Sequence, residues 1–208
     1  PPLERGARRG EARYRRLVAV CREYGALTPE DPYPLWPEAQ PRYRLVPLFL
    51  LYDYSFRPPE VPAERALEWA AESGILCADE AFLHPDPYAS LPAWCTARCR
   101  DTEGRLQKAA ATLPLVLINH YPLRQDLMSL GQYPRFSLWC GTRATEDWHR
   151  RFPVAAVVYG HLHRRGAQIR DGVRFCEVSL GYPQDWDPAL GMESYLQEIL
   201  PEPEPVAD

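Results

Sequence analysis

Residues 154–163 read VAAVVYGHLH, an apolar run of small and β-branched residues that ends at a glycine and is followed by two histidines. Residues 113–120, LPLVLINH, follow the same plan and end in Asn119 and His120. Short, continuously apolar runs are typical of strands buried on both faces of a largely parallel sheet. We therefore predict an α/β fold in which these two segments are central strands.

The rest of the chain supplies elements that suit this class. Helical spacing of apolar residues predicts helices within 10–27, 62–74 and 93–110, and Gly25 and Gly74 occupy helix-stop positions in the first two. The apolar run 44–56 predicts a buried strand with a proline near its start. Asp171 and Gly172 separate two β-rich runs, which is the strongest short-range signal for a β-hairpin.

Size and charge limit the classes of protein that fit. The 208 residues suffice for one domain, which we expect over 1–200, followed by a disordered acidic tail at 201–208. No apolar run approaches the roughly 20 residues needed to cross a bilayer, so we expect a cytoplasmic protein. The net charge of -4 makes a nucleic-acid partner unlikely.

Three of the five histidines follow the two central strands: His120, His161 and His163. Ligands in open α/β sheets bind beyond the carboxyl ends of the strands, so these imidazoles are expected to meet at one edge. Residues two apart in extended chain project to the same side, and Gly160 allows a sharp turn before them. Neutral imidazole is a common metal ligand, which favours a metal site. The alternative is that each ring bonds to a backbone carbonyl.

The motif GHLH at 160–163, with NH at 119–120 closing an earlier strand, resembles the last two motifs of the calcineurin-like metallophosphoesterases. The hairpin and the sequence SLGYP that follow are also similar, so the resemblance extends over about 113–183. Sequences elsewhere, such as CREYGALTPEDPYPLW, resemble a bacterial branch that includes a phosphopantetheinyl hydrolase. The resemblance implies a four-layer α/β/β/α sandwich, of which this chain would form the C-terminal portion.

The resemblance also implies a centre of two divalent metal ions, of manganese, iron or zinc, that hydrolyses a phosphomonoester or a phosphodiester. His120 and His161 would bind one ion and His163 the other. The substrate would be a small-molecule or carrier-bound phosphate ester.

Three further residues are candidates for this site. Asn119 would orient a metal ligand or a phosphate oxygen. Arg124 follows NHYPL and Arg164 follows GHLH, so both are candidates to bind phosphate.

The family's earlier motifs are Asp-x-His, Gly-Asp-x-x-Asp and Gly-Asn-His-Asp/Glu, and none of them occurs ahead of Asn119. The chain also begins at Pro1 rather than at a methionine. These features predict the C-terminal part of a longer enzyme, which by itself would be inactive and marginally stable. Two alternatives stay open: a degenerate, non-catalytic binding module, and a nuclease of the same family.

Two other patterns suggest metal or phosphate chemistry. Cys99 and Arg105 have the spacing of cysteine-dependent phosphatases, but the acidic residues between them would repel phosphate. Cys95 and Cys99 are four residues apart, which favours helical packing over a zinc site. His149 lies in a short helical segment and is expected at its surface.

Overall fold

The computed structural model describes residues 9–36 and 42–200, and within them the strands form one six-stranded mixed sheet. In spatial order the strands are β1 (Leu35–Trp36), β2 (Tyr43–Pro47), β3 (Leu115–Ile118), β4 (Val154–Tyr159), β6 (Val173–Glu177) and β5 (Gly166–Arg170). The four central strands are parallel, while β1 and β5 pair antiparallel at the two edges. The predicted α/β class is therefore confirmed, with 113–120 and 154–160 supplying two central strands.

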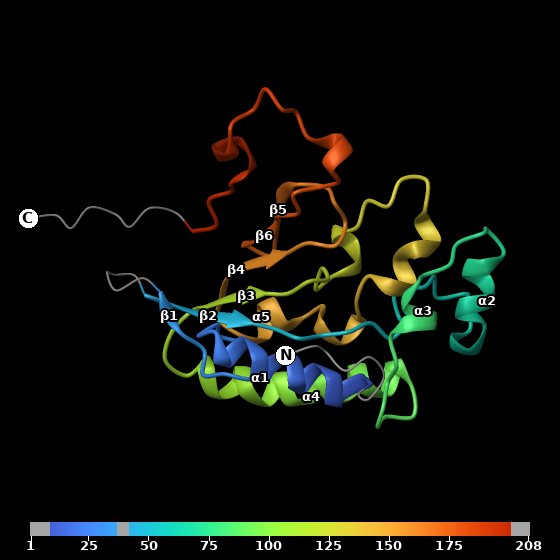
Figure 1. Ribbon diagram of the computed structural model, residues 1–208, viewed down its shortest axis with the longest axis horizontal. Coiled ribbons are helices and arrows are strands. Elements are labelled where there is room, and N and C mark those ends of the chain that lie inside the picture. The colour runs from blue at the N-terminus through green and yellow to red at the C-terminus, as the bar shows by residue number, and fades with distance from the viewer. Residues whose placement is uncertain (1–8, 37–41, 201–208) are drawn as a thin grey trace, which may run out of the picture.

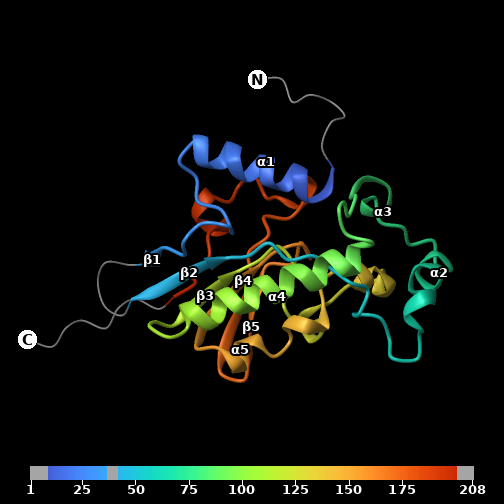
Figure 2. The same cartoon turned by 90° about the horizontal axis from the view of Figure 1, so that it is seen from below.

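The helices are α1 (Gly10–Glu23), α2 (Ala66–Ala71), α3 (Asp79–Phe82), α4 (Leu91–Ala109) and α5 (Trp148–Arg151). Short 3-10 turns occur at Ala63–Arg65, Gln125–Leu127, Pro134–Trp139, Arg143–Thr145, Pro183–Asp185 and Met192–Tyr195. Figure 1 shows α1 and α4 together on the β2 side of the sheet, whereas the last described segment lies beyond β5. In Figure 2, α2 and α3 lie apart from α1 and α4, at one end of the molecule.

A row of side chains across the sheet forms the centre of the core. The strand registers place Val46, Leu117, Val157 and Phe175 next to one another, and none of the four is exposed. They share one core cluster with Trp94, from α4. Because side chains alternate across a strand, the neighbouring row lies on the opposite face. That row includes Ile118 and Val158, which are only half-buried.

The side chain of Arg98 joins α4 to α1 and to the segment after β2. Its guanidinium donates to the carbonyl of Phe49 at 3.1 Å and to Glu30 at 2.6 Å, and it lies 5.3 Å from the ring centroid of Tyr14. Only 7% of the Arg98 side chain is exposed. Burial of an arginine with this many partners fixes the position of α1.

The structure tests three expectations drawn from the sequence. The strand expected over 44–56 ends at Pro47, and the residues that follow are buried without a β-ladder. The hairpin is confirmed: Asp171 and Gly172 connect β5 and β6 with φ values of 50° and 79°. Cys95 and Cys99 lie in the α4 core, as helical packing requires.

Two further expectations concern the ends of the chain and the membrane. The acidic tail 201–208 lies outside the described residues. Within the parts of the chain that the structure covers, every helix is too short or too polar to span a bilayer.

Candidate active site

The carboxyl ends of β3 and β4 bring the two histidine-bearing segments together. Ile118 pairs with Val158 in the parallel register, so the residues after them leave the sheet side by side. The amide of Gly160 donates to the carbonyl of His120 at 3.0 Å, which joins the two segments directly. The edge predicted from the sequence therefore exists, and backbone hydrogen bonds define it.

His120 and His161 are in direct contact at this edge. His161 Nδ1 lies 3.1 Å from His120 Nε2, and the ring centroids are 4.9 Å apart. Tyr121 packs against both rings at 4.7 Å, and Phe136 stacks on His161 at 5.7 Å. The aromatic contacts fix the orientation of the two imidazoles.

Both rings are held in their neutral form at pH 7. Burial lowers the pKa of His161 to about 4, and the nearby charges of His120 and His163 lower it further, while the Trp139 backbone acts in the opposite direction. Burial also lowers the pKa of His120, although the Asp79 carboxylate partly opposes it. A neutral imidazole keeps a lone pair for a cation or a proton.

His163 lies near this pair but does not join it. Its ring is exposed and packs on Tyr182, with 4.2 Å between ring centroids. Its charge still lowers the pKa of both other imidazoles. In the described part of the chain, no three histidine, cysteine or acidic side chains are placed to hold one metal ion. The structure thus brings two of the three expected ligands into contact and directs the third to Tyr182.

The backbone that presents His161 and His163 is in an unusual conformation. Their φ angles are 73° and 55°, in the left-handed region that non-glycine residues seldom occupy. Such angles cost free energy and persist only where the surrounding structure determines them, which occurs most often at functional sites.

Two buried polar atoms on the segments that carry the histidines have no hydrogen-bond partner within the described residues. One is Nε2 of His161 and the other is Oδ1 of Asn119, whose Nδ2 donates to the carbonyl of Tyr121 at 2.8 Å. Buried polar groups in native proteins are almost always satisfied, so the unpaired Oδ1 acceptor of Asn119 and the unpaired ring nitrogen of His161 indicate missing partners. A divalent cation, with its bound water, would satisfy acceptors of this kind. These unpaired atoms are the observation on which a metal proposal can rest, since no three ligating side chains of the described residues surround one ion.

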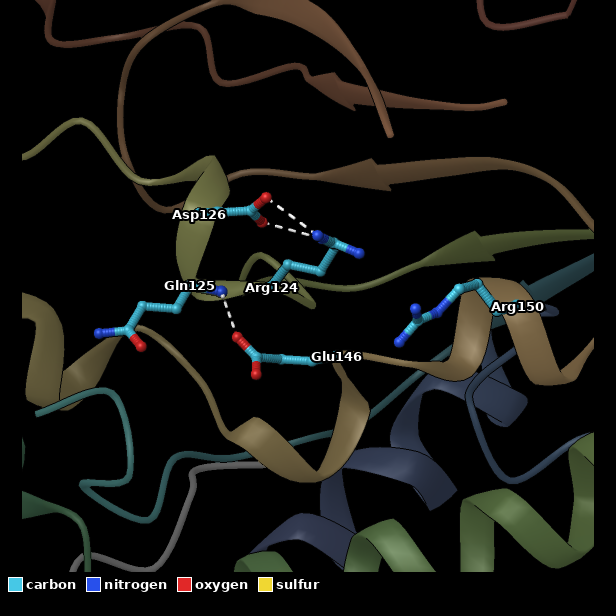
Figure 3. Close-up of a pocket in the computed structure, with 5 residues that line it drawn as sticks. All are labelled: Arg124, Gln125, Asp126, Glu146 and Arg150. Carbon is cyan, nitrogen blue, oxygen red and sulfur yellow. Dashed lines mark hydrogen bonds and ion pairs between the residues drawn. The ribbon is translucent and has the colours of Figure 1, made fainter. Parts of the chain in front are cut away.

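The two arginines expected to bind phosphate lie in different places. Figure 3 shows Arg124 paired with Asp126, and both of these bonds measure below 3.0 Å. Arg124 also reaches Asp171, in the turn before β6. That turn lies at the amino ends of the parallel strands, on the order of 15 Å along the sheet from the histidines. Arg164 is exposed directly after the GHLH motif.

His149 was expected at a helix surface, and this expectation is wrong. Its side chain is 1% exposed and its Nε2 lies 2.7 Å from Asp171 and 3.0 Å from Arg124. Asp147 and His149 do have Asp-x-His spacing, but they come after Asn119 in the chain and lie at the amino ends of the strands. They do not supply the family's first motif at the histidine edge.

Sequence reasoning did not single out Asp79, Phe136 or Tyr182, each of which acts on a different one of the three histidines. Asp79 lies on α3, Phe136 in the 3-10 turn Pro134–Trp139 and Tyr182 after β6. No motif marks them, because their proximity to the histidines comes from packing of distant segments.

No protein-family model matches the chain. It is 44% identical over 196 residues to the [acyl-carrier-protein] phosphodiesterase PptH of Mycobacterium tuberculosis. The crystal structure of phosphopantetheinyl hydrolase (PptH) from the same organism superposes with a TM-score of 0.88 at 41% identity, covering all of this chain and 74% of that one. The chain belongs to the PptH family.

The family's fold and this chain's fold are therefore the same over the compared region, including the six-stranded sheet. The match covers 94% of this chain but 60% of the curated PptH sequence. The chain thus spans about three fifths of that relative's length.

Proposed function

We propose that the protein acts in the hydrolysis of a phosphodiester, with a phosphopantetheinyl group on a carrier protein as the substrate class. The observation that carries the proposal is the contact between His120 and His161 at the carboxyl edge, where the buried Nε2 of His161 has no hydrogen-bond partner among the residues that the structure describes. Its support is the 44% identity to an acyl-carrier-protein phosphodiesterase.

The metal dependence of this activity rests on the metallophosphoesterase resemblance and on the unpaired acceptors. His120 and His161 would hold one divalent ion and His163 the other, with manganese, iron or zinc as candidates. When bound, the ions would stabilise negative charge on the phosphoryl group and acidify a water molecule. Burial keeps the rings of His120 and His161 neutral and ready to bind.

The surrounding residues orient the imidazoles and the substrate. Tyr121 and Phe136 limit rotation of the two contacting rings. The free Oδ1 of Asn119 would accept a hydrogen bond from a bound water or ligand at the same edge. The exposed guanidinium of Arg164 is the better candidate to bind a phosphate oxygen, because Arg124 is already paired with two carboxylates.

The finer fold proposal is the four-layer sandwich. Its support here is the difference between the two sheet faces: Val157 is fully buried on one face and Val158 is half-buried on the other. A second sheet packed on the latter face would complete the burial of that row.

We further propose that the 208 residues have little activity alone. Only two of the three proposed ligands are in contact, and no carboxylate completes a metal-holding group within the described residues. A non-catalytic binding module is the second candidate, and this same observation favours it.

The test is a zinc and manganese titration of the protein by calorimetry, alongside His161→Ala and the matched control His84→Ala. His84 lies on a separate loop after α3. We expect binding that falls at least tenfold in His161→Ala and is unchanged in His84→Ala. Hydrolysis is then measured on a carrier protein bearing phosphopantetheine. Absence of metal binding in the parent chain, or equal losses in both variants, would contradict the metal proposal.

A further inference from the structure

A buried carboxylate lies at the same sheet edge as the histidines. Glu177 ends β6 and pairs in register with Tyr159, the residue before Gly160. Its side chain is almost completely buried, at 2% exposure. One oxygen accepts a 2.5 Å hydrogen bond from the Ser179 hydroxyl, while Oε2 is buried without a partner in the described residues.

The Ser179 hydroxyl lies directly against Gly160. A methyl group at Gly160 would come within 3.2 Å of Ser179 Oγ, which is closer than ordinary van der Waals contact. Beside it, the amide of Val178 donates to the carbonyl of Tyr159 at 2.8 Å. Ser179 therefore limits the space in which the Gly160 peptide can move.

Gly160 in turn sets the backbone of the histidine motif. Its amide donates to the His120 carbonyl at 3.0 Å, and its carbonyl accepts from the Leu162 amide at 2.9 Å. His161 and His163, whose φ angles lie in the left-handed region, are on either side of Leu162. Displacement of Gly160 would thus change both the His120 contact and the turn that carries the other two histidines.

We propose that Glu177 and Ser179 are positioning residues that hold Gly160 in place and thereby maintain the strained backbone at His161 and His163. A carboxylate fixes the direction of a serine hydroxyl more strongly than a neutral acceptor does. Burial of a polar side chain is costly unless it is hydrogen-bonded, so the presence of Glu177 at this edge indicates a role beyond packing. Any catalytic consequence rests on the proposed function, whereas the positioning itself does not.

Glu177 lines a cavity of about 150 Å³ next to the motif. Leu162, Arg164 and Arg165 line the same cavity. The cavity is large enough for a water molecule, which would bond to the polar groups that line it. The Glu177–Ser179 pair thus restricts, through its hydrogen bond, the turn that carries His161 and His163.

The direct test is amide hydrogen exchange on the metal-free protein. In Ser179→Ala, we expect the Gly160 and Leu162 amides to exchange at least tenfold faster. The Leu115 amide, which donates to the Pro153 carbonyl at the other end of the strands, should be unchanged. The matched control is Ser73→Ala, whose hydroxyl bonds to the Ala70 carbonyl near α2. Unchanged exchange at Gly160 and Leu162, or equal acceleration at all amides, would overturn the proposal.

Further variants at Glu177 and Gly160 keep the test decisive if Ser179→Ala changes stability as well as exchange. Glu177→Gln retains a carbonyl that can accept from Ser179, so its effect on the same two amides should be smaller than that of Glu177→Leu. Gly160→Ala should accelerate exchange by itself but add nothing in a Ser179→Ala background, because the contacting Oγ is then gone. Equal effects of Gln and Leu, or a fully additive double variant, would count against positioning.

A metal titration links the pair to the proposed function. We expect Ser179→Ala to weaken zinc binding at least tenfold, with Ser73→Ala unchanged. If the parent chain binds no zinc, the proposed function fails while the exchange experiment still decides the positioning role. If zinc binds equally well to Ser179→Ala, the proposed effect of this pair on the metal ligands is wrong.

Discussion

Nδ1 of His161 lies 3.1 Å from Nε2 of His120, although 41 positions separate the two residues in the chain. The parallel pairing of Ile118 with Val158 produces this contact, because both strands then end at the same level. The Gly160 amide closes the junction by donating to the His120 carbonyl. The histidine pair is thus a direct consequence of sheet register.

The lowered pKa of His161 predicts a stability that depends on pH in the metal-free protein. The folded-state pKa is about 4 and the unfolded value is 6.5, so the unfolded chain binds more protons between these limits. The free energy of unfolding should therefore be fully present above pH 6.5 and fall by up to about 3 kcal/mol as the pH drops to 4.

Urea denaturation in the presence of EDTA, from pH 4 to pH 8, measures this dependence. The His161→Gln variant should lose most of the slope between pH 4 and 6.5. An identical slope in the variant would show that other groups cause the dependence.

Truncation of the central core row should destabilise the fold. Val157→Ala removes two methyl groups from a fully buried site between Leu117 and Phe175, which predicts a loss of about 2 kcal/mol in the free energy of unfolding. Val178→Ala is the matched control, because Val178 is 37% exposed and should cost much less. Equal midpoints in urea for the two variants would argue against this row as the core.

Loss of the Arg98 side chain should loosen α1. Arg98→Leu leaves Glu30 without its arginine partner and removes the bond to the Phe49 carbonyl, so we expect a loss of about 3 kcal/mol. Arg100→Leu, on the same helix with 81% of its side chain exposed, should change stability by less than about 0.5 kcal/mol. Thermal unfolding separates the two outcomes, and a neutral Arg98→Leu would show that the buried pair does not hold α1.

The two candidate arginines should differ in which property they affect. Arg124→Ala breaks pairs with Asp126 and Asp171, so it should lower the melting temperature and leave the Kd for free phosphopantetheine unchanged. Arg164→Ala should raise that Kd by roughly tenfold, the equivalent of one charge-assisted hydrogen bond, without a change in melting temperature. Calorimetric titration with phosphopantetheine, together with differential scanning fluorimetry, checks both, and the reverse pattern would place phosphate at Arg124.

The sequence by itself determined the elements whose signal is local. The apolar runs at 113–120 and 154–160, the Asp171–Gly172 turn and the α4 helix all have patterns that depend on neighbouring residues only. The sequence also indicates that the carboxyl ends of these two strands meet, since parallel strands end at the same edge of a sheet. These features predicted the α/β class and the meeting of His120 with His161.

Tertiary structure alone decided the features that depend on distant packing. The run after Pro47 is apolar enough for a strand, yet it is buried without a β-ladder. His149 has the pattern of a surface residue, but the β5–β6 turn covers it with Asp171. The ring of His163 packs on Tyr182, and Glu177 reaches Gly160 through Ser179. Each of these contacts joins residues that no local spacing relates, because a side chain's environment is set by whichever segments the fold places against it.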